Sequence, residues 1–464
     1  MYHGFGNFRF YPPRTCTTIH ANPTSPWCNS VRGAKRSLFL SPNNWQFFST
    51  AWMRRFARPL LYTSPLFRPT LSILWARHGL RGVANMEGSS NGVNGKPTTW
   101  HGAGAAEFDM RSDTMTKPTP SMLEAICQTT LLDDVFEEDP VTNDLQNYVA
   151  QLTGHEAALL VMSGTMGNQV SIRTHLVEPP YSVVCDHRSH VICYEAGGVS
   201  AWTGATVIPI VPKNNIHLTL EDIQKKVVIS DNIHTCPTKL ISLENTLDGM
   251  IMPLEEARKI TEWAHKNGMT VHLDGARLWE AVASGAGSLA DFAKLFDSVS
   301  LCFSKGLGAP IGSIIVGSDA FIKKARWFRK SIGGGARQTG VIAAPARVAL
   351  DETFGNDPSG QRGKLRETHL KAQRVADMWT SRGGKLASPV HTNMVWLDIE
   401  ASRLGPNDLA EIGKEKGLKL LGNRIVVHYQ VSDDAISRLE QVFDLAMKGQ
   451  YRQSTDTSKP YGSR

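Results

Sequence analysis

Three motifs in this 464-residue sequence place reactive or anion-binding groups directly after segments that we expect to be strands. Residues 163–168 (Ser-Gly-Thr-Met-Gly-Asn) form a small-residue turn before a helix, which can aim backbone N–H groups and the positive helix end at a phosphate. Asp274 ends the expected strand 270–274, where a carboxylate can keep a pyridinium nitrogen protonated. Lys305 lies between a strand expected to be buried and the glycine-containing segment 306–309, so desolvation can lower its pKa and favour imine formation.

Each motif also has an ordinary interpretation when it is taken alone. The turn could be a tight loop with an N-cap, the aspartate a helix cap and the lysine a solvated charge. In open α/β sheets, however, ligands collect at the carboxyl ends of strands, and the three motifs follow three strands of one expected sheet in chain order. A phosphate-binding turn, a strand-end Asp and a strand-end Lys are the three contacts that pyridoxal 5′-phosphate needs. The combination therefore predicts an enzyme that uses this cofactor, with Lys305 holding it as a Schiff base.

The elements that must position these groups follow from an alternation of short β-branched runs and amphipathic helical stretches that begins at Phe108. This alternation is typical of a mostly parallel sheet covered by helices. One helix is well delimited, because Pro253 opens it and Gly268 closes it. We expect an α/β protein whose large domain holds a mostly parallel seven-stranded sheet covered by helices. Its strands are expected at residues 158–162, 182–186, 206–210, 240–244, 270–274, 298–303 and 313–316.

A second, smaller domain is expected at the C-terminal end. After residues 351–363, which are rich in Gly, Pro, Asp and Asn, the pattern changes to that of an α+β domain. Its expected elements are a helix at 364–382, a strand at 394–399, a helix from about Pro406, a strand at 424–428 and a helix at 433–447. The predicted divisions are a leader (1–86), a linker (87–105), a large cofactor-binding domain (106–355), a small domain (356–450) and a polar tail (451–464).

The positive charge of the chain is concentrated in the leader. Residues 1–86 contain ten Arg, one Lys and no Asp or Glu, so removing these eleven charges from the net +7 leaves −4 for the rest. The folded part therefore gives no support for a nucleic-acid partner. An acid-free, Arg-rich leader is typical of mitochondrial import. The alternatives are a disordered basic tail, or a translation start at Met86 and then a cytoplasmic protein.

Neither a membrane span nor a metal site is expected. The sequence has no run of about eighteen apolar residues, which a bilayer-spanning helix needs. The seven cysteines are dispersed without a CxxC pair, which indicates reduced thiols rather than a zinc site.

Six longer motifs carry a more specific resemblance. They are DMRSDTMTKP (109–118), DVFEEDP (134–140), the turn at 163–168, DGAR (274–277), SKGL (304–307) and GGGARQ (333–338). Together they resemble the low-specificity L-threonine aldolases, which are pyridoxal-phosphate enzymes folded like aspartate aminotransferase. The resemblance runs from about Asp109 to Met447 and is strongest up to Leu350. It implies cleavage of L-threonine, L-allo-threonine or similar small β-hydroxy amino acids to glycine and an aldehyde such as acetaldehyde. It also implies a homodimer or homotetramer with active sites at the dimer interface.

The resemblance implies a role for each matching position. Lys305 corresponds to the Schiff-base lysine and Asp274 to the partner of the pyridine nitrogen. The acceptor of the β-hydroxyl proton is expected to be His190, His234 or a water that they hold. The further implied contacts are Gly164 and Thr165 to the phosphate, His190 stacked on the ring, Arg277 near the phenolic oxygen, Arg337 reaching the phosphate from a neighbouring subunit, Ser112 and Arg424 on the substrate carboxylate, and His234 near the β-hydroxyl.

At one place the sequence departs from the family. Members usually follow Glu-Asn-Thr with His, whereas residues 244–246 (Glu-Asn-Thr) are followed here by Leu247. The loop lies next to an expected strand end, so the preferred substrate could change with it. A β-elimination or racemisation on the same fold, or a catalytically silent homologue that binds the cofactor or a partner protein, are the alternatives.

Overall fold

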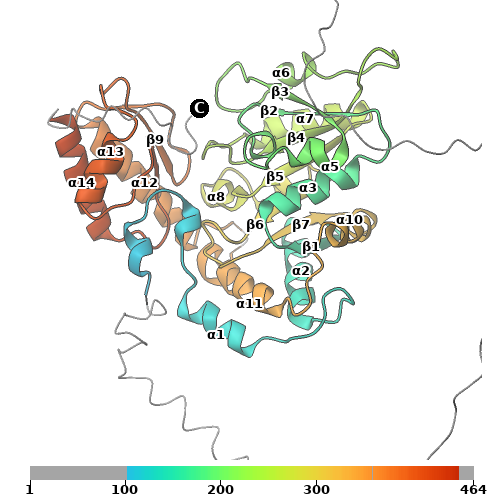
Figure 1. Cartoon of the computed structure of the whole chain (residues 1–464), viewed down its shortest axis with the longest axis horizontal. Coiled ribbons are helices and arrows are strands. Elements are labelled where there is room, and N and C mark those ends of the chain that lie inside the picture. Colours follow the sequence, from blue (N-terminus) through green and yellow to red (C-terminus); the bar gives the residue numbers. More distant parts are fainter. Residues whose placement is uncertain (1–101, 358, 449–464) are drawn as a thin grey trace, which may run out of the picture. The chain divides into compact units, whose positions relative to one another are not determined.

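We describe the computed structural model of the chain over residues 102–357 and 359–448. This part contains a seven-stranded sheet with strand order β1-β7-β6-β5-β4-β2-β3 and a three-stranded sheet with strand order β10-β9-β8 (Figure 1). The predicted leader (1–86), the predicted tail (451–464) and most of the predicted linker lie outside the described residues.

The large sheet confirms the predicted α/β class. Strands β3, β2, β4, β5 and β6 pair in parallel with their neighbours, while β7 runs antiparallel to both β6 and β1. The carboxyl ends of β4, β5 and β6 therefore meet at one edge, where a ligand site is expected. The strands lie within two residues of their expected limits: β1 Ala157–Val161, β2 Ser182–Asp186, β3 Thr206–Ile210, β4 Thr238–Glu244, β5 Thr270–Gly275, β6 Ser298–Cys302 and β7 Ser313–Gly317.

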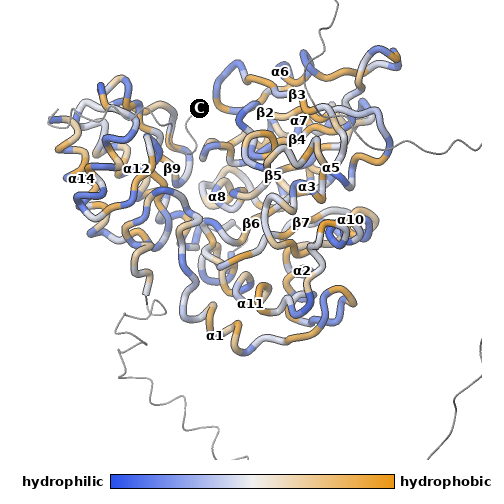
Figure 2. Tube along the Cα trace, viewed as in Figure 1, coloured by the Kyte–Doolittle hydropathy of each residue, from blue (hydrophilic) through white to orange (hydrophobic). Residues whose placement is uncertain are grey.

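Amphipathic helices cover this sheet. Helix α3 (Gly164–His175) packs against β5, β6 and β7, while α7 (Leu254–Lys266) packs against β5 and follows Pro253 as expected. Apolar and polar residues alternate along helices such as α10, so that one side of each can be buried (Figure 2). The other helices are α1 Pro120–Gln128, α2 Pro140–Thr153, α4 His190–Cys193, α5 Gly198–Thr203, α6 Leu220–Gln224, α8 Leu278–Ala283, α9 Leu289–Ala293, α10 Asp319–Ser331 and α11 Gly340–Ala349, with a π-helix at Leu350–Phe354.

The smaller α+β unit has its own hydrophobic core. Helices α12 (Lys364–Thr380), α13 (Asp408–Glu415) and α14 (Asp433–Met447) bury their apolar sides together with a three-stranded antiparallel sheet. Two of its strands, β9 (Met394–Asp398) and β10 (Arg424–Val426), were expected, whereas the two-residue strand β8 (Lys385–Leu386) is too short to give a periodic signal.

A segment near the N-terminal end of the described chain belongs to this second core. Met110 is fully buried among the residues of the small unit. Its backbone N–H donates to the carbonyl of Lys419 at 3.0 Å, and its carbonyl accepts from the N–H of Val426 at 2.9 Å. The sequence pattern grouped residues from 106 onward with the large domain, because so short a segment has no periodicity that reveals its partner. These contacts carry the following residues, 111–115, to the edge of the predicted site; 3-10 helices occupy Gly104–Phe108 and Asp113–Met115.

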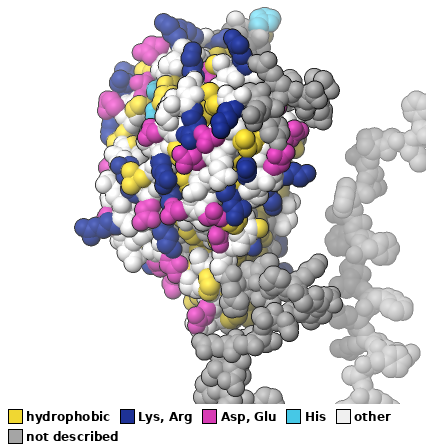
Figure 3. All heavy atoms as spheres, turned by 90° about the vertical axis from the view of Figure 1, so that its left-hand side faces the viewer, with side chains coloured by type: hydrophobic (Ala, Val, Ile, Leu, Met, Phe, Trp, Pro, Cys, Tyr) yellow, Lys and Arg dark blue, Asp and Glu magenta, His cyan; other side chains and the backbone are white. Residues whose placement is uncertain are grey.

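Charges of both signs are interspersed on the face shown in Figure 3, where Lys and Arg side chains alternate with Asp and Glu. This face therefore presents no extended field of one sign. Among the described residues, no helix combines the length and the apolar composition that crossing a bilayer requires.

Candidate active site

A cavity of about 440 Å³ opens at the carboxyl ends of β4, β5 and β6. Its wall includes residues of the large sheet, of the segment after Met110 and of the small unit, among them Trp396. Half of the ten predicted site residues line it, namely Ser112, His190, Arg277, Lys305 and Arg424. The structure thus brings together residues from three separate regions of the sequence.

Lys305 follows β6 by three residues and is held through its backbone. Its carbonyl accepts hydrogen bonds from the hydroxyl of Thr116 at 3.2 Å and from the N–H of Gly308 at 2.9 Å. No acidic group lies within ion-pair distance of its amine among the described residues. The turn therefore holds the backbone of Lys305, and the amine has no ion-pair partner in the described part of the chain, which leaves it available for covalent attachment to an aldehyde.

Asp274 lies at the end of β5 and is almost fully buried, with 3% of its surface exposed. One carboxylate oxygen accepts from the N–H of Ala276 at 3.0 Å, and the other accepts from the side-chain amide of Asn168 at 2.7 Å. These two donors fix the orientation of the carboxylate.

The predicted phosphate turn forms the first turn of α3. Ser163 caps the helix, because its side chain accepts from the N–H of Met166 at 3.2 Å. The N–H groups of Gly164 and Thr165 make no hydrogen bond within the described chain, as expected of the first residues of a helix. These N–H groups are available to an anion.

His190 is oriented by two carboxyl groups. Its ring Nδ1 lies 2.9 Å from Oε1 of Glu195, and its backbone N–H donates to Oε2 of Glu244 at 2.8 Å. Asn168 donates to the same oxygen of Glu195 at 2.9 Å. His190, Glu195 and Asp274 come within 4.8 Å of one another, and the amide of Asn168 joins the two carboxylates.

Arg277 is paired with a buried acid that the sequence did not reveal. Its Nε and Nη2 donate to the two oxygens of Asp113 at 2.8 and 2.6 Å. Burial alone would raise the pKa of the Asp113 carboxyl, but the charge of Arg277 and its hydrogen bonds hold that pKa at about 2. The pair fixes the guanidinium against the cavity wall.

The pair of Arg277 and Asp113 predicts that part of the free energy of unfolding is lost at acidic pH. Folding lowers the pKa of Asp113 from 3.8 to about 2, so the pair stabilises the folded state above about pH 4 and loses this effect as the pH falls towards 2. The effect is about 2 kcal/mol. In denaturant unfolding, the stability difference between wild type and Asp113→Asn should shrink over this range. A constant difference would contradict the assignment; Glu367→Gln, on the exposed side of α12, serves as the control.

Arg424 is a half-buried cation without an anionic partner in the described part of the chain. Its Nη2 donates to the carbonyl of Arg111 at 3.0 Å, and its buried Nε has no hydrogen-bond partner among the described residues. Burial, together with the nearby charge of Arg277, lowers the pKa of this guanidinium. A substrate carboxylate would satisfy the Nε donor and offset both unfavourable effects. Ser112 lines the same cavity.

The residues present fit pyridoxal phosphate. An amine without a counter-ion at Lys305, an oriented carboxylate at Asp274 and free N–H groups at the start of α3 match its aldehyde, its ring nitrogen and its phosphate in chemical type. The three groups follow or end three strands of the same sheet, β6, β5 and β1, as the sequence predicted.

Comparison with known proteins decides the family. Residues 109–402 match the model of the beta-eliminating lyases. The chain belongs to this family. An aldolase of Penicillium aethiopicum is 51% identical over 77% of this chain and 90% of its own length. A low-specificity L-threonine aldolase of Eremothecium gossypii is 43% identical (76% and 92%), and an alanine racemase of Cochliobolus carbonum 42% identical (75% and 90%). A solved Leishmania major threonine aldolase shares the fold, with a TM-score of 0.62, 19% identity and coverage of 74% of this chain and 99% of its own.

Glu244 is a cavity residue of this beta-eliminating lyase that sequence reasoning missed. It ends β4 and is the register partner of Asp274 on β5. Burial and the neighbouring charge of Asp274 raise the pKa of Glu244 well above its usual value. Glu244 therefore holds a proton more readily than an ordinary carboxyl group does. The only available signal in the sequence was the position of Glu244 at a strand end.

Leu247 forms part of the cavity wall, so the departure from the family pattern faces the site. It is 5% exposed, and the loop is closed by hydrogen bonds between the backbones of Leu247 and Met250. The next residue, Asp248, also lines the cavity, and burial raises the pKa of its carboxyl. This lyase therefore has an apolar side chain and an acid where a histidine was expected.

Two of the predicted residues outside the cavity wall, His234 and Arg337, are also exposed. His234 is exposed on the loop between α6 and β4. Arg337 is 55% exposed at its side chain and donates to Asp133 at 2.7 Å. A single chain therefore does not bring either residue to the group around Lys305.

Proposed function

We propose that this protein uses pyridoxal 5′-phosphate to cleave L-threonine and L-allo-threonine into glycine and acetaldehyde. The observation that carries the proposal is that Lys305 and Arg424 face one cavity, beside the buried carboxylate of Asp274. These groups can hold an aldehyde cofactor, bind an α-carboxylate and stabilise a protonated ring nitrogen. Support for threonine comes from relatives named low-specificity L-threonine aldolases, which are 43–44% identical.

When bound, the cofactor supplies an electron sink for the electron pair that stays on the substrate Cα after its bond to Cβ is cleaved. Arg424 and Ser112 bind the substrate carboxylate and so orient the bond between Cα and Cβ for cleavage. Asp274 keeps a proton at the ring nitrogen. His190, or a water held by it, accepts the proton of the β-hydroxyl, and Glu195 fixes the direction of the His190 ring. His234 could join them only if its loop moved toward the cavity.

Product analysis tests this proposal. Incubation of the purified protein and cofactor with L-threonine should give glycine and acetaldehyde in equal amounts. Formation of 2-oxobutyrate and ammonia would instead show β-elimination, and D-amino acids would show racemisation, which the relative named alanine racemase makes a specific alternative. Cofactor binding without any turnover would indicate a silent homologue. Each of these three results would overturn the aldolase proposal.

Replacing Arg424 should weaken substrate binding. Arg424→Ala removes the charged donors that face the carboxylate, and a hydrogen bond to a charged group is worth about 1.5–3 kcal/mol, so kcat/KM should fall by about 10- to 100-fold, mainly through KM. Arg366→Ala, at an exposed position of α12, is the control. Steady-state kinetics with L-threonine would check this, and an unchanged KM in Arg424→Ala would refute the assigned contact.

The assembly and the cellular location belong to the same proposal. We propose a homodimer or homotetramer in which Arg337 reaches the phosphate of a neighbouring subunit, a role compatible with its exposure outside the cavity of its own chain. We also propose that residues 1–86 direct mitochondrial import, with a start at Met86 as the alternative. Light scattering, and imaging of a reporter fused to residues 1–86, test the two points.

A further inference from the structure

A continuous series of hydrogen bonds runs from Asp274 to the opposite edge of the large sheet. The side-chain amide of Asn168 donates to Asp274 at 2.7 Å, and its carbonyl oxygen lies 3.1 Å from Nε2 of His272. Nδ1 of His272 lies 2.8 Å from the hydroxyl of Ser298, which lies 2.7 Å from Nε2 of His175. We call these four residues behind Asp274 the relay.

The fold brings the relay together by simple periodicity. His272 and Asp274 are two residues apart on β5, so they lie on the same face of the sheet. Asn168 and His175 are seven residues apart on α3, which is about two helical turns, and α3 packs on that face. Ser298, the first residue of β6, is the register partner of His272.

The hydrogen bonds of the relay all point in one direction. The amide of Asn168 faces two carboxylates with its N–H groups, so its oxygen must accept and Nε2 of His272 must donate. A neutral His272 then has a lone pair at Nδ1, to which Ser298 donates its single proton. The Ser298 oxygen must in turn accept from Nε2 of His175. Every donor therefore points towards Asp274.

Both imidazoles of the relay are neutral at ordinary pH. Burial lowers the pKa of His272 to about 4 although the charge of Asp274 opposes this shift. Burial, together with His272, lowers the pKa of His175 to about 3. Since a neutral imidazole has one donor and one acceptor nitrogen, the orientation of the relay is unique.

Two other acidic side chains lie close to Asp274, at the end of the relay. Glu244 is paired with Asp274 in the sheet register, and Glu195 shares the Asn168 amide with it. Neighbouring carboxylates disfavour each other's ionisation, whereas a donor stabilises the one it faces. On the other side, Lys305 and Arg277 supply positive charge to the cavity. The Asn168 amide therefore lies between two acids, and its orientation determines which donor reaches Asp274.

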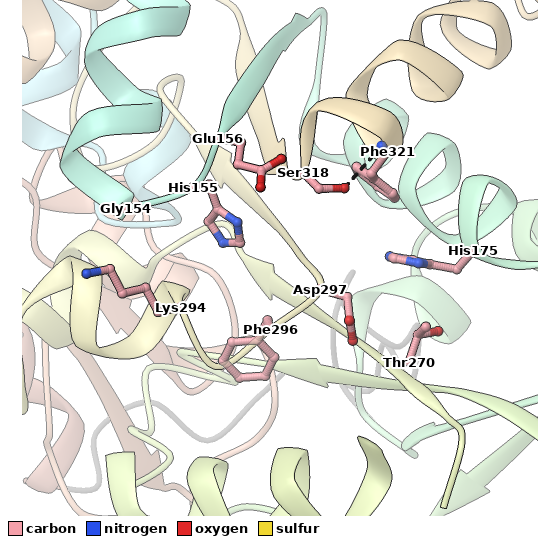
Figure 4. A pocket seen from close by; sticks show the side chains of 10 residues that line it. All are labelled: Gly154, His155, Glu156, His175, Thr270, Lys294, Phe296, Asp297, Ser318 and Phe321. Atoms are coloured by element: carbon pink, nitrogen blue, oxygen red, sulfur yellow. Dashed lines mark hydrogen bonds between the residues drawn. The ribbon is translucent and has the colours of Figure 1, made fainter. Parts of the chain in front are cut away.

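The far end of the relay opens into a second pocket, of about 460 Å³, at the amino-terminal edge of β5 and β6. Figure 4 shows His175 at one side of this pocket, with Asp297 and Thr270 beside it and Lys294 across from it. His175 is partly exposed here, whereas Asn168, His272 and Ser298 are buried with all side-chain hydrogen-bonding atoms paired. The relay is therefore buried along its length and becomes exposed only at the ring of His175, in the second pocket.

We propose that Asn168, His272, Ser298 and His175 are positioning residues that hold Asp274 as a carboxylate aimed at the ring nitrogen of pyridoxal phosphate and thereby set how strongly the ring withdraws electrons. The inference rests on the proposed cofactor. It assigns a function to a fully paired polar network which would otherwise only fasten α3 to the sheet. Loss of the relay favours transfer of the ring proton to Asp274. A ring without this proton withdraws electrons less strongly from its linkage to Lys305. The Lys305 nitrogen in that linkage then binds its own proton more tightly.

Spectral titration of the bound cofactor, without substrate, tests the proposal. Ser298→Ala removes the hydroxyl that donates to Nδ1 of His272 and so interrupts the relay between His175 and His272. The pH midpoint of the visible absorbance band should rise by roughly half a unit or more, the size that the loss of one hydrogen bond implies. Ser182→Ala is the matched control, because Ser182 also begins a strand, is also fully buried and bonds to Thr238 on the adjacent strand. It should lose similar thermal stability without moving the midpoint.

A second pair of variants separates positioning from packing. His272→Gln keeps a side-chain N–H that can donate to Asn168, so it should shift the midpoint less than His272→Leu does. Equal midpoints in wild type, Ser298→Ala and both His272 variants would overturn the relay but leave the proposed function intact. If only Ser298→Ala folds, its midpoint alone decides. Absence of any band in the wild-type protein would overturn the proposed cofactor, and this inference with it.

Discussion

Replacing Lys305 with alanine is expected to lower glycine production from L-threonine by at least about 10³-fold, because the residue that forms a covalent catalytic link has no substitute in the cavity. Among the described residues that line the cavity, Lys305 is the one lysine. The visible absorbance band of the bound cofactor should disappear in the same variant. Coupled assays for glycine and acetaldehyde, together with a spectrum, measure both effects.

The matched control for this change is Lys294→Ala. Lys294 lines the second pocket, at the opposite edge of the sheet, so its loss should leave both the band and the rate unchanged. Retention of more than a tenth of the wild-type rate in Lys305→Ala would show that another group carries the covalent step.

Asp274→Asn should lower kcat by about 10²- to 10³-fold while the cofactor stays bound. The substitution keeps the shape of the side chain but removes the charge that holds a proton on the ring nitrogen, and interactions that stabilise developing charge in a buried site have effects of this size. The loss should fall on kcat rather than on KM, because Arg424, not Asp274, binds the substrate carboxylate. Steady-state kinetics and the absorbance spectrum of the same preparation distinguish the two effects.

Asp222→Asn provides the comparison. Asp222 is also a buried acid, but it caps α6, away from the cavity. This variant should lose stability and keep kcat. A normal kcat in Asp274→Asn would mean that the ring nitrogen needs no charged partner, and the assignment of Asp274 would be wrong.

Much of the large domain could be predicted from the sequence because each strand is a short apolar run with clear limits. The residues before Asp274 and Lys305 are buried strands, and the polar residue that follows a buried strand at a sheet edge is easy to recognise. Gly268, with φ of +70°, ends its helix where the pattern placed the end. Local signals of this kind do not depend on distant parts of the chain.

The contacts that complete the site could not be predicted, because they join residues far apart in the sequence. Asp113 meets Arg277 across 164 positions, and Asn168 meets Asp274 across 106. No periodicity connects such pairs. Met110 gave no sign of its place in the second core for the same reason. Family resemblance supplied the roles of His190 and Arg424, but not the acids that orient them.

The resemblance also assigned roles that one chain does not fulfil in this conformation. His234 and Arg337 are both exposed and lie outside the cavity wall. A loop movement for His234 and a neighbouring subunit for Arg337 remain predictions, since exposure alone does not show either. Leu247, by contrast, was singled out from the sequence and does face the cavity.

Borohydride trapping determines whether Lys305 holds the cofactor covalently. The protein reconstituted with pyridoxal phosphate is reduced with borohydride, digested and mapped by mass spectrometry. We expect a single stoichiometric pyridoxyl modification, located on Lys305 and absent when L-threonine and excess hydroxylamine have removed the cofactor beforehand. Stoichiometric modification of any other lysine, or none at all, would contradict it.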